Sequence, residues 1–184
     1  MRKLISVFIL FFSFFLSSQE PLFTLIDSEK NGITFSNDLV HTKDHSIFLY
    51  ANYYGGAGVG IGDFDNDGLD DIFLAANLID DKIYKNLGNF QFEDKTKLSG
   101  IINNGSWSTG VTVADVNNDG LLDIYVSCEL YDDAPFLRTN KLYINKGDFK
   151  FVESAKKWGV DVDRRTRHSV FFDYNNDGLL DLYL

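Results

Sequence analysis

Asp63-Phe64-Asp65-Asn66-Asp67-Gly68-Leu69-Asp70-Asp71 is an acidic stretch with a central glycine, and it occurs three times in this chain of 184 residues. Residues 115–123 and 173–181 repeat it with aspartate at the first, fifth and ninth positions and glycine at the sixth. A motif that returns at intervals of about 50 residues is the sign of a repeat architecture. The three loops therefore mark three repeat units, and the segments around each loop can be compared with one another.

Short apolar runs flank each copy of the loop. Residues 58–62 and 110–114 precede the first two copies and alternate in period two, which is typical of strands. Residues 72–74, 124–126 and 182–184 follow the loops, and their apolar character suits strands buried on both faces.

A hairpin signature completes each unit. Residues 82–93 match residues 141–152, and Gly88-Asn89 and Gly147-Asp148 are expected to form the tight turns between paired strands. Each unit therefore offers four short strands.

Four antiparallel strands per repeat predict an all-β fold built from β-propeller blades. The expected organisation is a signal peptide (1–18), an N-terminal strand segment (19–55), repeat 1 (56–106), repeat 2 (107–166) and a truncated repeat 3 (167–184). About two and a half blades would then follow the N-terminal segment, as in a fragment of a longer protein. The alternative is a β-sandwich with chance similarity between loops, which the matching flanks disfavour.

The first residues have the three-part plan of an export signal. A basic start, Met1-Arg2-Lys3, precedes an apolar run from Leu4 to Leu16, and small and polar residues follow. The run is shorter than the roughly 20 residues of a membrane-spanning helix. We expect a secreted or cell-surface protein with no membrane span after cleavage; an uncleaved anchor is the alternative.

The net charge and the cysteine content argue against several classes of function. The formal net charge of -10 argues against nucleic acid as a partner and against adhesion to anionic lipid. The single cysteine, Cys128, has no internal disulfide partner and is expected to be a buried structural thiol.

The loops have the donor pattern of a calcium site. Calcium binds six to eight oxygen atoms, and side chains at positions 1, 3 and 5 with a carbonyl at position 7 can wrap around one ion when glycine stands at position 6. Position 9 closes the site. The expected ligands, with the carbonyl supplied by the leucines, are Asp63, Asp65, Asp67, Leu69 and Asp71; Asp115, Asn117, Asp119, Leu121 and Asp123; and Asp173, Asn175, Asp177, Leu179 and Asp181.

These loops are not EF-hands. The bidentate glutamate that an EF-hand requires at position 12 is replaced by Leu74, Val126 and Leu184, and the flanks favour strands over helices. Magnesium fits less well because it demands a rigid octahedron. The alternative without metal is a hydrogen-bonded Asn-Asp-Gly turn, which leaves the carboxylates at positions 1 and 9 unexplained. The first loop has four carboxylates and the others three, so we expect it to bind calcium most tightly, with a structural role for the ion.

These residues resemble the FG-GAP/VCBS repeat proteins, and most closely the cartilage-acidic-protein-like bacterial group, which often carries an ASPIC/UnbV domain. Residues 23–35 and 53–63 are similar to the opening of that group. The resemblance implies a calcium-binding propeller. The Phe-Gly and Gly-Ala-Pro signatures of integrin propellers are missing, so that comparison supports the fold and the metal but not the ligand.

The expected function is a cell-surface or extracellular binding or adhesion module for a protein or glycan ligand. Tyr53, Tyr54, Trp107 and Trp158 are candidate contacts, although packing in the blades is their commoner fate.

Two other functions stay open: the propeller scaffold of a larger secreted enzyme, and an inactive fragment. The three histidines, His41, His45 and His168, form no HExxH motif, and no catalytic motif is recognised, so we do not expect this chain to be an enzyme. Residues 23–33 resemble the unit endings 92–101 and 151–160, which suggests that this segment completes a blade in a longer protein.

Overall fold

Two four-stranded antiparallel sheets and one two-stranded sheet form the fold of residues 21–184, the part that the computed structural model describes. The expected signal peptide lies outside the described residues. The first sheet contains β1 (Val59–Gly62), β2 (Asp71–Leu74), β3 (Lys82–Asn86) and β4 (Phe92–Asp94); the second contains β5 (Trp107–Ala114), β6 (Asp123–Glu129), β7 (Lys141–Asn145) and β8 (Phe151–Glu153); the third contains β9 (Val170–Phe172) and β10 (Asp181–Tyr183).

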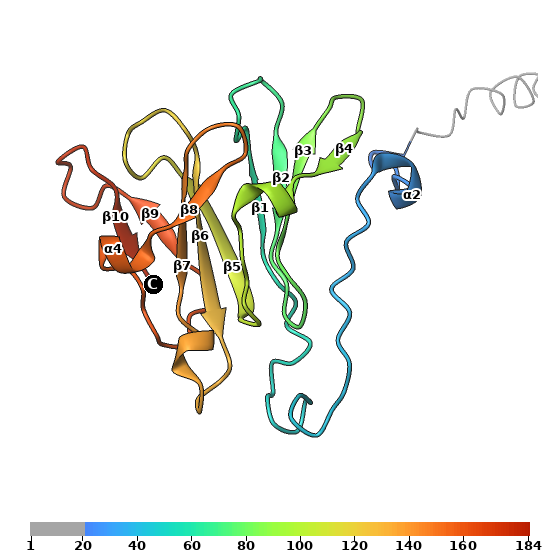
Figure 1. Ribbon diagram of the computed structural model, residues 1–184, viewed down its shortest axis with the longest axis vertical. Coiled ribbons are helices and arrows are strands. Elements are labelled where there is room, and N and C mark those ends of the chain that lie inside the picture. Colours follow the sequence, from blue (N-terminus) through green and yellow to red (C-terminus); the bar gives the residue numbers. More distant parts are fainter. Residues whose placement is uncertain (1–20) are drawn as a thin grey trace, which may run out of the picture.

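In each sheet the strands follow one another in chain order, β1 to β4 and β5 to β8, as in propeller blades. Figure 1 shows the sheets side by side as a fan, and the first strands are neighbours, since β1 contacts β5 and β5 contacts β9. The predicted all-β class and the blade architecture are confirmed.

The three acidic loops lie at the same end of the fan, at the top of Figure 1. We call this end, formed by residues 63–70, 115–122 and 173–180, the acidic rim. The turns between β3 and β4 and between β7 and β8 reach the same end. The fold therefore repeats one acidic loop per blade along one edge of the molecule.

The main core lies between the two complete blades. It includes Phe64 and Phe73 of the first blade and Ile124, Tyr143 and Phe151 of the second. A second cluster joins the second blade to Phe171 and Leu182 of the two-stranded sheet. All seven residues of β6 are buried, as expected for a strand covered on both faces.

Glycine in β1 lets the two blades approach closely. A β-carbon added at Gly60 would lie 2.7 Å from the Cγ1 atom of Val111 and 2.9 Å from the Cγ2 atom of Val113, both on β5. Any larger residue would force the strands apart. The glycines that precede the first acidic loop are thus explained by packing.

Equivalent backbone hydrogen bonds link the first blade to the second and the second blade to the segment that follows it. The backbone N–H of Ser108 donates to the carbonyl of Ala76, and the N–H of Thr166 donates to the carbonyl of Cys128, each over 3.0 Å. Cys128 is fully buried with a free thiol, as predicted.

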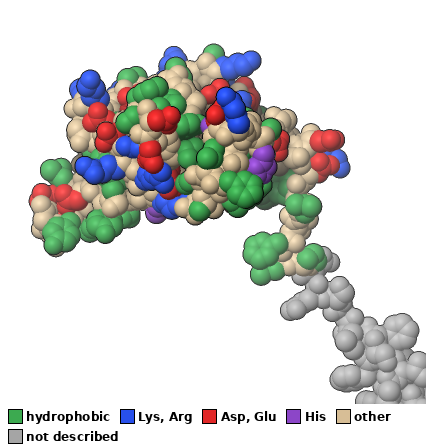
Figure 2. Space-filling model, turned by 90° about the horizontal axis from the view of Figure 1, so that it is seen from below, with side chains coloured by type: hydrophobic (Ala, Val, Ile, Leu, Met, Phe, Trp, Pro, Cys, Tyr) green, Lys and Arg blue, Asp and Glu red, His purple; other side chains and the backbone are tan. Residues whose placement is uncertain are grey.

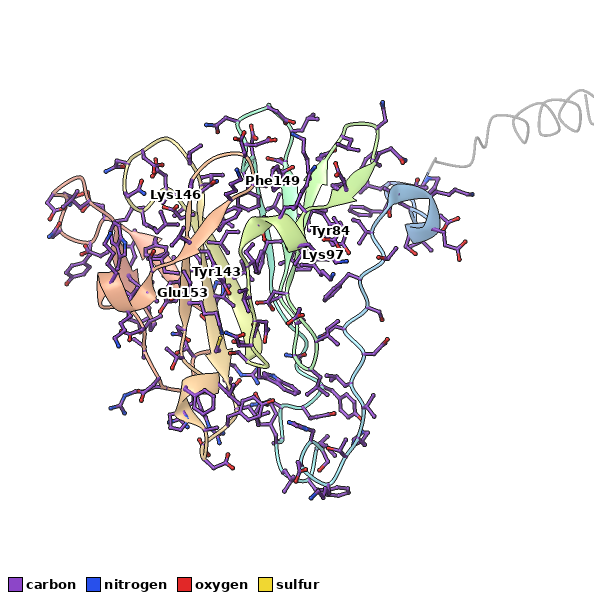
Figure 3. The ribbon with its side chains drawn as sticks, in the orientation of Figure 1. Tyr84, Lys97, Tyr143, Lys146, Phe149 and Glu153 are labelled. Carbon is purple, nitrogen blue, oxygen red and sulfur yellow. The ribbon has the colours of Figure 1, made fainter. Side chains whose placement is uncertain are left out.

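The hairpin turns form, but one residue later than predicted. The N–H of Gln91 donates to the carbonyl of Gly88, so Asn89 and Phe90 are the central residues, with φ of 52° and 56°. The second turn is alike, with Asp148 and Phe149 at the centre. Glycine is therefore the first residue of each turn, and a phenylalanine adopts the left-handed conformation. Phe149, labelled in Figure 3, is buried against the first blade.

The strand expected within 19–55 does not form in the described residues of that range. The segment contains the helix α2 (Ser28–Asn31), and its first apolar residues, such as Phe23 and Leu25, are exposed. They have no strand beside them to supply ladder hydrogen bonds, and an isolated extended segment is not stable in water.

The predicted similarity between residues 23–33 and the unit endings 92–101 and 151–160 is found in their short helices. α2, α3 (Thr96–Ser99) and α4 (Ala155–Trp158) each end on a glycine with positive φ. A β-carbon at Gly32 would strike the carbonyl of Phe92 on β4, and one at Gly100 would strike that of Phe151 on β8. Residues 28–32 therefore pack against the last strand of the first blade in the same way as residues 96–100 pack against the last strand of the second blade.

Between residues 21 and 184 the structure contains no helix with the length and apolar character needed to cross a membrane. A short 3-10 helix, η2 (Pro135–Leu137), lies in the connection between β6 and β7.

Candidate metal centre

One hydrogen-bond frame shapes all three loops. In the first loop, Asp63 accepts from the N–H groups of Asp67 (3.0 Å) and Gly68 (2.8 Å), and Asp67 accepts from the N–H of Leu69 (3.0 Å). The second and third loops repeat these bonds with distances between 2.8 and 3.1 Å. The sequence repeat is thus also a repeat of local structure, fixed by side chains that accept from nearby backbone N–H groups.

Two loop positions need a left-handed backbone. Gly68, Gly120 and Gly178 at position 6 have φ between 84° and 89°, as the motif predicted. Position 4 is also left-handed, with Asn66 at 58°. Asparagine tolerates this conformation better than most residues, and the sequence interpretation had not assigned it a role.

The aspartate at position 9 ties each of the first two loops to its blade. Asp71 is the first residue of β2 and is fully buried; its Oδ2 accepts from the N–H of Phe64 (2.9 Å) and its Oδ1 from the N–H of Asn86 (2.8 Å). Asp123 accepts equivalent bonds from Val116 and Asn145. Position 9 is therefore structural as well as a candidate ligand.

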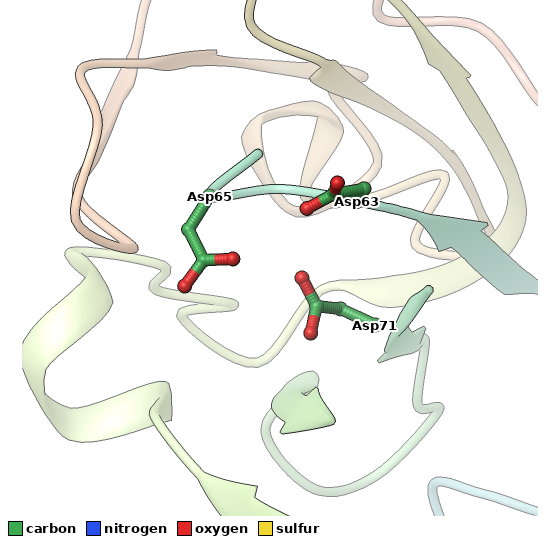
Figure 4. Close-up of side chains that lie close together, drawn as sticks. All are labelled: Asp63, Asp65 and Asp71. Atoms are coloured by element: carbon green, nitrogen blue, oxygen red, sulfur yellow. The ribbon is translucent and has the colours of Figure 1, made fainter. Parts of the chain in front are cut away.

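The first loop brings three carboxylates to one point. Asp63, Asp65 and Asp71 each place an oxygen within 4.8 Å of the others, and Figure 4 shows the three groups turned toward one another. The Oδ1 atom of Asp65 is buried and has no hydrogen-bond partner. Converging carboxylate oxygens, one of them unpaired, fit a hard divalent cation such as Ca²⁺.

Electrostatics in this loop favour a counter-charge. Burial raises the pKa of Asp71 to about 6, against the opposing effect of the N–H groups of Asn86 and Phe64, and the charges of Asp65 and Asp67 raise it further. A buried carboxylate among like charges is costly unless a cation is near.

Lys85 on β3 places its ammonium group in the first loop. Its Nζ atom forms ion pairs with Asp65 and, over 2.8 Å, with Asp67. These contacts lower the pKa of Asp67, mainly through the hydrogen bond from Lys85, and raise that of Lys85. Asp65 and Asp67 therefore both face the lysine, and only Asp65 is also part of the convergent group.

The second and third loops are arranged differently at position 3. Asn117 donates from its amide to Asp119, and Asn175 donates to Asp177, each over 2.9 Å. Within the described residues, the acidic side chains of these loops do not form a three-carboxylate group like that of the first loop.

The leucines at position 7 occupy equivalent places. Leu69, Leu121 and Leu179 each donate their backbone N–H to the position-5 aspartate. The predicted metal residues thus occupy matching places in three equivalent loops: positions 1 to 7 lie on the acidic rim, and position 9 is the first residue of the strand that follows.

Sequence reasoning missed several residues around the loops. Besides Lys85, Asn145 donates from its amide to the carbonyl of Phe64 (2.8 Å) and so links the second blade to the first loop. Asn86 is its counterpart in the first blade and donates to the carbonyl of Asp70. The repeated asparagine at the end of residues 82–86 and 141–145 is the signal that could have indicated them.

The candidate contact residues divide into two pairs. Tyr53 and Trp107 are buried and pack against each other, whereas Tyr54 and Trp158 are 62% and 44% exposed. Figure 2 views the end opposite the acidic rim and shows histidine beside hydrophobic side chains.

Two of the histidines, and Arg167 next to the third, lie against neighbouring side chains. His41 contacts Tyr54, and His45 lies 3.2 Å from the hydroxyl of Tyr131. Arg167 pairs with the buried Glu129.

Successive four-stranded blades, each with a nine-residue acidic loop between its first two strands, define a propeller-type repeat protein. The model of a family described as "FG-GAP-like repeat" matches residues 63–126 and 132–184. The chain belongs to this family.

The chain is also similar to a protein named cartilage acidic protein 1 from Xenopus tropicalis. The two are 26% identical over 161 residues, which cover 86% of this chain and 24% of the relative. This chain therefore spans about a quarter of the length of that relative.

Proposed function

We propose that this chain is an exported, calcium-binding FG-GAP repeat protein that acts as a cell-surface or extracellular binding or adhesion module for a protein or glycan ligand, and that it is not an enzyme. The observation that carries the calcium assignment is the convergence of Asp63, Asp65 and Asp71 around a buried oxygen of Asp65 that lacks a partner. Ca²⁺ would be held there by these side chains, and its role would be structural.

The binding assignment is supported by the surface. The exposed Tyr54 and Trp158 have amphipathic rings, which often contact ligands. A scaffold role within a larger secreted enzyme is the second candidate, supported by the fact that the chain covers 24% of its relative.

Calcium titration of the chelator-treated protein tests the proposal. A calcium concentration of about one hundred times Kd should stabilise the fold by about 2.7 kcal/mol per independent site, measured as a rise in thermal unfolding temperature. Magnesium at equal concentration should give a smaller rise. A protein whose unfolding is unchanged by calcium and by chelator would disprove the assignment.

The ligand class is tested with an oligosaccharide array, probed with calcium and with chelator, using the native chain and Tyr54→Ala. A calcium-dependent signal that this substitution removes would support a glycan ligand. An empty array, together with calcium-dependent binding to immobilised extracellular proteins, would favour the protein ligand.

A further inference from the structure

The first and second acidic loops differ in the group that donates a hydrogen bond to the carboxylate at position 5. In the second loop, the amide of Asn117 donates to Asp119. In the first loop, position 3 is Asp65, which has no donor to offer, and Lys85 contacts both Asp65 and Asp67. The ammonium group of Lys85 thus supplies the hydrogen bond that asparagine supplies in the other loops.

The strand that supplies Lys85 shows the same exchange. Residues 82–86 match residues 141–145, and the place of Lys85 is taken by Ile144, which is buried. In the first repeat, aspartate at loop position 3 is therefore accompanied by lysine on the third strand. In the second repeat, asparagine at loop position 3 is accompanied by isoleucine at the same place on the third strand.

Lys85 is held firmly in this position. Its side chain is 22% exposed, and its Nζ atom lies 5.6 Å from the centre of the Phe149 ring. An ammonium group over an aromatic face is attracted to it. Because Phe149 belongs to the second blade, packing between the blades helps to keep the ammonium group in the loop.

The charges at the ligand positions are then equal. The first loop has four aspartates at its ligand positions, and Lys85 beside them brings the sum to -3; the second loop has three aspartates at its ligand positions, also -3. The expectation that the first loop binds calcium most tightly rested on four carboxylates without Lys85. A divalent ion that uses Asp65 or Asp67 must also displace the ammonium group or tolerate its repulsion.

We infer that Lys85 is a built-in counter-cation of the first loop: it keeps this loop folded without metal and competes with calcium for Asp65 and Asp67, so that the second loop binds calcium more tightly than the first. This inference rests on the proposed calcium binding. It makes Lys85 the residue that sets the order in which the two loops fill.

Calorimetric calcium titration tests the inference in a background that carries Asp119→Ala and Asp177→Ala, which remove a ligand from the second and third loops. In this background Lys85→Met removes the charge but keeps the length of the side chain. It should raise the affinity of the remaining site at least about tenfold, as expected for removal of a charge a few ångströms from the ion. Lys85→Arg should keep the low affinity.

Lys82→Met is the matched control, since Lys82 lies on the same strand and pairs with Asp94 away from the loop. It changes the net charge equally and should leave the affinity within about twofold. Thermal unfolding in chelator gives a second readout: Lys85→Met should lower the unfolding temperature of the metal-free protein while it raises calcium affinity. A merely structural lysine would lower both.

The outcomes separate the inference from the proposed function. Calcium binding that is equal in the background protein and in Lys85→Met, or weaker in the latter, overturns the role of Lys85 and leaves the calcium site standing. Binding that is detected only after Lys85→Met supports the inference. If the native chain and every variant fail to bind calcium, the inference and the proposed function both fall.

Discussion

The side-chain amide of Asn66 in the first acidic loop donates a hydrogen bond to the carbonyl oxygen of Gly120 in the second, over 3.0 Å. The loops of consecutive blades are thus linked directly on the acidic rim. Asn66 and Asn118 share the left-handed backbone, with φ of 58° and 56°, but no side-chain bond to a neighbouring loop is found for Asn118 in the described structure.

We predict that Asn66→Ala destabilises the protein by about 1 kcal/mol more than Asn118→Ala. Both substitutions place alanine in the left-handed region, and only the first also removes a hydrogen bond between loops. Urea unfolding of the two variants in chelator measures the difference. Equal losses would show that the bond between the loops contributes no stability.

Phe149 and Phe90 allow a second matched comparison. They occupy the same turn position with φ of 56°, but Phe149 is 3% exposed and Phe90 is 65% exposed. Phe149→Ala should lower the free energy of unfolding by about 3–5 kcal/mol because it opens a cavity between the blades. Phe90→Ala should change it by less than about 1 kcal/mol; similar effects in denaturant titrations would place the role of Phe149 in the turn rather than in the core.

Asp81 gives a prediction for pH dependence. Burial raises its pKa to about 6, against the opposing hydrogen bonds from Ala76, Asn103 and Ser108. A folded-state pKa above the unfolded value means that the folded protein binds the proton more tightly. The contribution to stability is then complete below about pH 4 and is lost as the pH rises through 6.

Asn140 occupies the place of Asp81 in the second blade, where it accepts from the N–H of Cys128, so Asp81→Asn is a substitution that the repeat already accommodates. Between pH 4 and pH 6, the native protein should lose about 2 kcal/mol relative to this variant, out of about 3 kcal/mol that the full pKa difference gives. Unfolding free energies of both proteins across this range in chelator test the prediction. Parallel pH profiles would contradict it.

The blade repeat could be predicted from the sequence because period-two runs and tight-turn residues are local signals. The candidate metal ligands could be listed from the sequence as well, because each loop is contiguous; their binding of calcium stays a prediction. The contribution of Lys85 was not, since it depends on pairing between β2 and β3, which places Lys85 beside Asp65 from 20 residues away. The N-terminal strand was predicted wrongly because its pattern is that of a blade ending, while the described residues around it include no partner strand.

Substitutions at Asp119 and Asp123 should distinguish the loss of calcium affinity from the loss of stability of the metal-free protein. Asp123 is 1% exposed and accepts from two backbone N–H groups, so Asp123→Asn leaves one buried donor facing an amide and should cost about 1–3 kcal/mol even in chelator. Asp119 is exposed, and Asp119→Asn still accepts from the N–H of Leu121 and loses only the exposed hydrogen bond from the amide of Asn117, so its cost in chelator should stay below about 0.5 kcal/mol. Both substitutions should weaken calcium binding at the second loop by about tenfold or more, because each removes a carboxylate charge from the ion. Calorimetry with calcium and urea unfolding in chelator measure the two effects; if Asp119→Asn unfolds the metal-free protein as readily as Asp123→Asn does, the hydrogen bonds of position 9 do not hold the loop to its blade.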